Sequence, residues 1–80
     1  MKKKINVAVL GTGFMGKLHS HMWRTVSKIF DVDYEPVLKV IFGTVESDTK
    51  AFCEKWGYEE WSMDWKKVIE RDDIDIVDIV

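Results

Sequence analysis

The feature that most constrains the fold is a group of closely spaced glycines that follows an apolar segment. Residues 5–10 read Ile-Asn-Val-Ala-Val-Leu, and residues 11–17 read Gly-Thr-Gly-Phe-Met-Gly-Lys. A nearly continuous apolar run with β-branched residues predicts a central strand that is covered on both faces. From Phe14 to Ile29 the apolar period changes to three and four residues, which predicts an amphipathic helix. Its buried stripe is predicted to consist of Met15, Leu18, Met22, Val26 and Ile29.

The glycines fit two phosphate-binding patterns, G-x-G-x-x-G and G-x-x-x-x-G-K. In the first, Gly11 makes a tight turn, Gly13 lets the backbone approach a pyrophosphate, and Gly16 lets the helix pack closely. The second requires Ser or Thr after the lysine to bind Mg²⁺, and that position holds Leu18. We therefore favour a dinucleotide turn over a degenerate P-loop or a structural turn that binds nothing. The candidate cofactor-binding residues are Gly11, Thr12, Gly13, Phe14, Met15 and Gly16, together with Gly43 and Thr44 after the second predicted strand.

The rest of the chain continues the alternation of strands and helices. We expect a loop over 31–36 and a strand over 37–42. A helix then runs from a Ser47 cap to Trp56, with Gly57 as its stop. A short helix after Ser62 or Asp64 buries Trp65, Val68 and Ile69, and a third strand covers 74–80. This order predicts an α/β chain, the first βαβαβ half of a doubly wound Rossmann-type parallel sheet with spatial strand order 3-2-1.

Crossovers that all run in one direction place every helix on one face of the sheet. The opposite face and the edge of the first strand would then be bare, so we expect a homo-oligomer. The third strand runs to the end of the sequence, so the chain reads as truncated.

Composition excludes several classes of partner. A net charge of −2 gives no electrostatic reason to expect nucleic acid or an anionic membrane, and no apolar run reaches the roughly 18–20 residues of a membrane span. The single cysteine, Cys53, cannot form an internal disulfide, which favours a reducing cytoplasm. His19 and His21 have no further ligand at metal spacing, so we expect no metal site.

Several segments together resemble the Gfo/Idh/MocA oxidoreductases, which act on sugars, inositols and related polyols with NAD(P). They are "VAVLGTGFMGKLHS", "PVLKVIFG", "AFCEKWGY" and "DWKKVIERDDIDIVDIV", and the resemblance covers essentially all 80 residues. It implies that residues 1–80 are a partial NAD(P)-binding domain of such an oxidoreductase. The family's Thr-Pro-Asn-like turn, its catalytic lysine and its C-terminal substrate domain are absent from the sequence. The resemblance therefore assigns no catalytic residue here, and we expect the chain alone to be inactive.

The form of the cofactor stays open. A typical NAD site has an acidic residue at the end of the second strand, but Glu35 precedes the predicted strand and Gly43-Thr44 follows it. Glu46 could substitute, or it could be a solvated turn residue. The absence of a nearby arginine for a 2′-phosphate favours NAD over NADP. The alternative function is a non-catalytic nucleotide-binding or regulatory half-Rossmann module.

Overall fold

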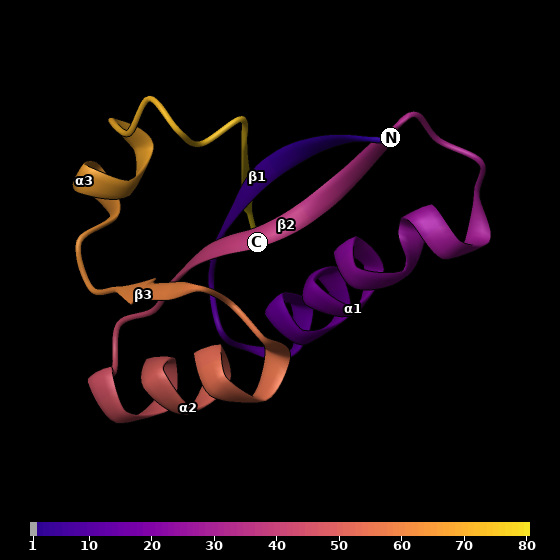
Figure 1. Ribbon diagram of the computed structural model, residues 1–80. Helices are drawn as coiled ribbons and strands as arrows, with labels where there is room; N and C mark the ends of the chain where they lie inside the picture. Colours follow the sequence, from indigo (N-terminus) through magenta and orange to yellow (C-terminus); the bar gives the residue numbers. More distant parts are fainter. Residues whose placement is uncertain (1) are drawn as a thin grey trace.

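The computed structural model describes residues 2–80, which form a parallel sheet with helices on both faces (Figure 1). The elements, in chain order, are β1 (Lys3–Leu10), α1 (Phe14–Ile29), β2 (Tyr34–Phe42), α2 (Glu46–Trp56), β3 (Glu60–Ser62), α3 (Trp65–Ile69) and β4 (Ile76–Ile79). The strands lie in the order β3-β2-β1-β4, and every neighbouring pair is parallel. The predicted α/β class and parallel sheet are confirmed.

The last strand lies on the other side of the sheet from its predicted place. The segment 74–80 was expected beside the second strand, but β4 pairs with β1 over Val7–Leu10. The place beside β2 is taken by β3, which pairs with Val40–Phe42. The order 3-2-1 therefore holds only with β3 as its third member. The sequence did not predict β3 because a strand of three residues gives no periodic signal.

Both faces of the sheet carry helices, and the prediction of a single covered face is wrong. In Figure 1, α1 and α2 lie on one side of the strands and α3 on the other. After β3 the chain reverses its direction across the sheet to reach β4, and a right-handed crossover then places its helix on the opposite face. Val68 of α3 is buried there against Ala8 and Val40. The edge of β1 is not free either, because β4 pairs with it.

The larger core lies between the sheet and the helices α1 and α2. It contains Val7, Val9, Leu38, Ile41, Phe52, Cys53 and Tyr58. Leu38 and Ile41 share one face, although residues three apart in a regular strand lie on opposite faces. The register between β1 and β2 shifts after Val7, which pairs with Leu38, whereas Ala8 pairs with Val40. This bulge adds one residue to β2 and so reverses the facing of every later side chain.

Helix α1 has its predicted bounds but buries a different face. Its buried residues are Gly16 and Ser20. The predicted stripe points largely to solvent, with exposed fractions of 50% for Met15, 46% for Leu18, 46% for Met22 and 69% for Ile29. Small residues on the inner face let the helix lie close to the sheet, which larger side chains would prevent.

The ends of β2 and α2 also differ from the predictions. Strand β2 begins at Tyr34, so Pro36 lies within it rather than in a loop. The missing N–H of Pro36 is tolerated because β3 pairs only with Val40–Phe42 and leaves that edge of β2 free at Pro36. Helix α2 begins at Glu46, and Ser47 does not cap it. Gly57 ends α2 in a left-handed conformation with φ 79°, as predicted.

The short helix α3 confirms one of its two predicted starts. The carboxylate of Asp64 accepts hydrogen bonds from the backbone N–H groups of Lys66 and Lys67, at 3.1 and 3.3 Å. Of the three residues predicted to be buried, Val68 is buried, whereas Trp65 and Ile69 are about half exposed. A helix of five residues can bury one position against the sheet but not a stripe.

Candidate functional site

The glycine turn lies at the carboxyl edge of the sheet, where β1 ends and α1 begins. The backbone N–H of Gly11 donates to the carbonyl of Phe42 at the end of β2, at 3.0 Å. On the other side, the N–H of Val80 donates to the carbonyl of Leu10 at 3.2 Å. The chain leaves β1 towards β2 and returns to its other side as β4, so the strand order reverses here. Ligands of open α/β sheets bind at the carboxyl ends of strands at such a switch point.

Two of the three glycines are required by the protein's own backbone. Gly11 has φ +135°, and a Cβ at this position would lie 2.6 Å from Cγ2 of Val80. A Cβ at Gly16 would overlap the carbonyl oxygen of Gly11 and lie 2.9 Å from its carbonyl carbon. Gly11 thus allows the tight turn, and Gly16 allows α1 to pack directly on it.

Gly13 has a different environment. It is the N-cap of α1 with φ −76° and ψ −161°, a conformation open to any residue, and a Cβ would meet no atom of residues 2–80 within 4 Å. No described side chain caps the helix. The first N–H groups of α1 have no acceptor within the helix, and they carry its partial positive charge. The turn therefore presents free backbone donors to open space, which fits an anionic phosphate group.

Gly43 and Thr12 close the turn against the start of α2. A Cβ at Gly43 would overlap the Thr49 hydroxyl oxygen and lie 3.0 Å from Cγ2 of Thr12. Thr49 is fully buried, and its hydroxyl donates to the carbonyl of Val45 at 2.7 Å. Thr44 follows Gly43 and is exposed. The structure thus brings the end of β2, with Gly43, next to the glycine turn.

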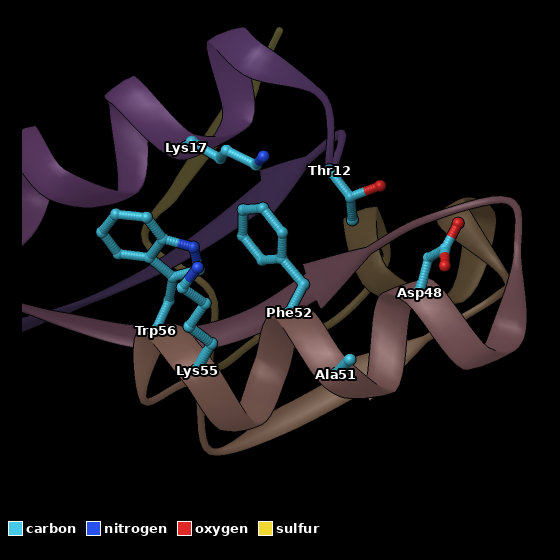
Figure 2. A pocket seen from close by; sticks show the side chains of 7 residues that line it. All are labelled: Thr12, Lys17, Asp48, Ala51, Phe52, Lys55 and Trp56. Atoms are coloured by element: carbon cyan, nitrogen blue, oxygen red, sulfur yellow. The ribbon is translucent and has the colours of Figure 1, made fainter.

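A cavity of about 320 Å³ lies beside the turn, between α1 and α2 (Figure 2). Its lining residues are Thr12, Lys17, Asp48, Ala51, Phe52, Lys55 and Trp56. In Figure 2, Lys17 extends from α1 above the ring of Phe52, while Lys55 and Trp56 come from α2. The indole N–H of Trp56 is buried and finds no acceptor among the described residues. Two ammonium groups face one carboxylate, so the cavity favours anionic groups over cations.

The two glutamates considered for ribose binding lie in different places. Glu35 pairs with Lys4 near the amino end of β2, far from the carboxyl edge that carries the turn. Glu46 is exposed in the first turn of α2, where the helix dipole favours a carboxylate without any ligand. In the described part of the chain, no group of three His, Cys, Asp or Glu residues could hold a metal ion. No helix of this part is long and apolar enough to cross a membrane.

A buried polar cluster behind the turn was missed at the sequence level. The hydroxyl of Ser20 donates to the carbonyl of Gly16 at 2.7 Å, and the Tyr58 hydroxyl lies 2.6 Å from Ser20 Oγ. Burial raises the pKa of Tyr58 to about 12, with a smaller contribution from the negative charge of Asp78, while the Ser20 hydrogen bond opposes the rise. Nearby, Asp78 accepts hydrogen bonds from His19 and Trp23. The sequence signal for this cluster was the carboxylate of Asp78, which lies within an otherwise apolar strand.

Comparison with known proteins gives relatives of one kind. No family model matches the chain. The chain is 33% identical over 78 residues to levoglucosan dehydrogenase from Pseudarthrobacter phenanthrenivorans. The aligned segment covers 96% of this chain and 20% of that protein. A solved structure of levoglucosan dehydrogenase in complex with NADH and L-sorbose matches with a TM-score of 0.92 and 33% identity, over 98% of this chain and 21% of that one.

Structures with lower sequence identity also match this fold. An NAD-binding oxidoreductase from Klebsiella pneumoniae matches with a TM-score of 0.87 and 26% identity, over 96% of this chain and 21% of that one. The apo scyllo-inositol dehydrogenase from Lactobacillus casei matches with a TM-score of 0.78 and 26% identity, over 100% of this chain and 22% of that one. The chain spans about a fifth of the length of these relatives. It is therefore similar, in sequence and in fold, to one part of sugar and inositol dehydrogenases and of an NAD-binding oxidoreductase.

Proposed function

We propose that this chain is the amino-terminal nucleotide-binding part of an NAD(P)-dependent oxidoreductase of the Gfo/Idh/MocA type, acting on a sugar, an inositol or a related polyol. The observation that carries the proposal is the open space at Gly13 in front of an uncapped helix N-terminus. The 33% identity to levoglucosan dehydrogenase and the likeness to scyllo-inositol dehydrogenase support the substrate class.

In this proposal the turn holds the pyrophosphate of the cofactor through backbone N–H groups. Gly11, Thr12, Gly13, Phe14, Met15 and Gly16 form the turn and the first turn of α1, and Gly43 with Thr44 borders the adenosine side. The partial positive charge at the start of α1 offsets the negative charge of the phosphates. Bound NAD would supply the hydride acceptor for oxidation of an alcohol.

NAD is the form of the cofactor that we favour. Gly43 and Thr44 provide no guanidinium for a 2′-phosphate, and three solved structures of levoglucosan dehydrogenase contain NADH. In this proposal residues 1–80 provide cofactor contacts, and the general acid or base and the substrate pocket belong to other parts of the enzyme. The purified chain should then show no turnover of NAD or NADP with any sugar or polyol, since hydride transfer needs those groups. Measured turnover by the chain would overturn this division.

The test of the phosphate site is a calorimetric titration of the chain with NADH. In Gly13→Val the added Cβ meets no atom of residues 2–80 within 4 Å, so the side chain can enter the open space at the helix N-terminus. We expect binding to weaken by more than about tenfold, because the pyrophosphate can no longer reach the amides. His21→Ala, at an exposed position of the same helix, is the control and should bind as the wild type does. Equal affinity of Gly13→Val and wild type would refute the role of the turn.

We also propose that the chain self-associates through α1. Met15, Leu18, Met22 and Ile29 recur at helical spacing and are about half exposed or more, so they form an apolar stripe on the outer face of the helix. Such a stripe gains free energy when a second copy covers it. Sedimentation velocity over a range of concentrations should show a dimer or larger species, and Leu18→Glu should shift it to a monomer. A wild-type chain that stays monomeric at high concentration would refute the proposal.

A further inference from the structure

One carboxylate oxygen of β4 accepts two hydrogen bonds from α1. Oδ2 of Asp78 lies 2.7 Å from Nδ1 of His19 and 2.9 Å from Nε1 of Trp23. The side chain of Asp78 is 15% exposed and that of His19 is 29% exposed. A carboxylate oxygen can only accept hydrogen bonds, so Nδ1 of His19 must carry the proton and donate it to Asp78, as the indole N–H of Trp23 also does. Both donors are one helical turn apart and project from the same side of α1.

These bonds connect the helix that carries the turn amides to the strand whose end lies against the turn. Strand β4 pairs with β1 through four residues, Ile76–Ile79, and Val80 then lies beside Gly11. A shift of α1 relative to β4 would therefore move the helix N-terminus relative to the carboxyl edge of the sheet.

Apolar packing holds α1 at few points. Its buried positions, Gly16 and Ser20, are small, Trp23 packs against the core between the sheet and α2, and the Met15-Leu18-Met22 stripe points away from the sheet. A rotation or slide of α1 would leave the Asp78 carboxylate largely buried without donors, which costs far more free energy than losing an exposed ion pair. The hydrogen bonds to Asp78 thus favour this orientation of the helix, in addition to the packing of Gly16 and the hydrogen bond between Ser20 and Tyr58.

We propose that His19, Trp23 and Asp78 form a positioning clamp that holds the start of α1 in the orientation in which its free amides bind a pyrophosphate. The inference rests on the proposed dinucleotide function. The three residues lie behind the turn, act through α1 and are positioning residues. If the clamp is broken and the competent orientation falls to about one tenth of the population, the apparent Kd rises about tenfold.

The experiment is a titration of the 80-residue chain with NADH in clamp variants. Asp78→Asn removes the charge, so the hydrogen bonds from His19 and Trp23 to its one remaining acceptor oxygen are weaker, and we expect affinity to fall about tenfold. His19→Ala should lower affinity several-fold. His19→Asn places an amide N–H near the position of Nδ1 and should bind within about twofold of wild type. The control is His21→Ala, with unchanged affinity.

A second readout reports the clamp without any ligand. The indole N–H resonance of Trp23, assigned through Trp23→Phe, should exchange slowly with solvent in the wild type and in His21→Ala, and quickly in Asp78→Asn. Circular dichroism selects temperatures at which each variant is folded, so that a mere loss of stability does not enter the affinities. If Asp78→Asn does not fold, the comparison of His19→Ala with His19→Asn decides.

Two outcomes overturn the inference in different ways. Wild-type affinity in His19→Ala and in folded Asp78→Asn, with fast exchange of the Trp23 indole, would refute the clamp and leave the phosphate site intact. Wild-type affinity in Gly13→Val would refute the phosphate site itself, and the clamp's role in binding with it. Weakened binding in the clamp variants, restored in His19→Asn, supports the proposal.

Discussion

Gly16→Ala should destabilise the fold, although alanine forms helices better than glycine does. The added Cβ would lie 2.9 Å from the carbonyl carbon of Gly11 and nearer still to its oxygen, whereas ordinary contact begins near 3.4 Å, so α1 must retreat by more than about 0.5 Å. The helix cannot simply tilt towards α2, because the same Cβ already lies 3.7 Å from the ring of Phe52. The new methyl group is enclosed on both sides.

The magnitude follows from two opposing effects. Overpacking of this kind typically costs about 1–3 kcal/mol. The gain in helix propensity is at most about 1 kcal/mol, and it is smaller in the first turn, where Gly16 lies. We therefore expect a net loss of roughly 1–2 kcal/mol. In a domain of this size each kcal/mol shifts Tm by about 4–8 °C, so Tm should fall by roughly 5–15 °C.

Thermal and urea unfolding followed by circular dichroism measure this loss. Gly13→Ala is the matched control, because its Cβ meets no described atom within 4 Å and its backbone conformation suits alanine. Its stability should fall by less than about 1 kcal/mol, because alanine is a somewhat poorer N-cap than glycine but adds no close contact. If Gly16→Ala is as stable as Gly13→Ala, then α1 does not pack on the turn as closely as described, and the assignment of separate roles to the two glycines fails.

Two further predictions concern ionisable groups. Burial raises the pKa of Tyr58 from its ordinary value of 10.0 to about 12 in the folded chain, so folding favours the protonated phenol. The free energy of unfolding should therefore be unchanged below pH 10 and fall by roughly 2 kcal/mol as the pH rises to 12. Tyr58→Phe should lack this loss in urea melts at pH 9 and pH 11.5, and a phenol absorbance that titrates at pH 10 in the folded chain would contradict the burial. Hydrogen bonds from the Arg71 guanidinium hold the pKa values of Glu60 and Asp73 below their usual ranges. Their contribution to stability is therefore present above about pH 4.5 and lost as pH falls through the lowered values, and Arg71→Gln should be less acid-sensitive than wild type in urea melts at pH 7 and pH 3.

The sequence predicted what depends on neighbouring residues. The turn, the bounds of α1 and the stop at Gly57 follow from local signals: a strand that ends at glycine, a change of period, and a residue that tolerates positive φ. The place of β4 was not predictable in this way, because its choice between the edges of β1 and β2 depends on how the chain crosses the sheet. The short β3 took the edge of β2, and β4 then paired with β1.

The buried side of α1 shows a limit of periodicity. The recurrence of Met15, Leu18 and Met22 identified a helix, but it did not say which face meets the sheet. That face carries Gly16 and Ser20, because a close approach needs small residues more than it needs apolar ones.

The clamp could not be predicted from the sequence either, because its hydrogen bonds join residues far apart in the chain: His19 and Asp78 are 59 positions apart, and Trp23 and Asp78 are 55. The usable signal was Asp78 itself, because a carboxylate inside the apolar strand Ile-Val-Asp-Ile-Val must find donors when the strand is buried.

The glycine at position 13 is the strongest argument against a turn that binds nothing. A purely structural turn needs glycine where φ is positive or where another atom lies too close, as at Gly11 and Gly16. Neither reason applies at Gly13, whose φ is −76° and where an added Cβ would meet no described atom within 4 Å. Ser, Thr or Asp would even be better N-caps, since their oxygens would bond the first amides of α1. A side chain there would also fill the space in front of those amides. The folded chain has no need of glycine in place of Ser, Thr or Asp at this position, whereas a phosphate that approaches the backbone closely favours the residue without a side chain.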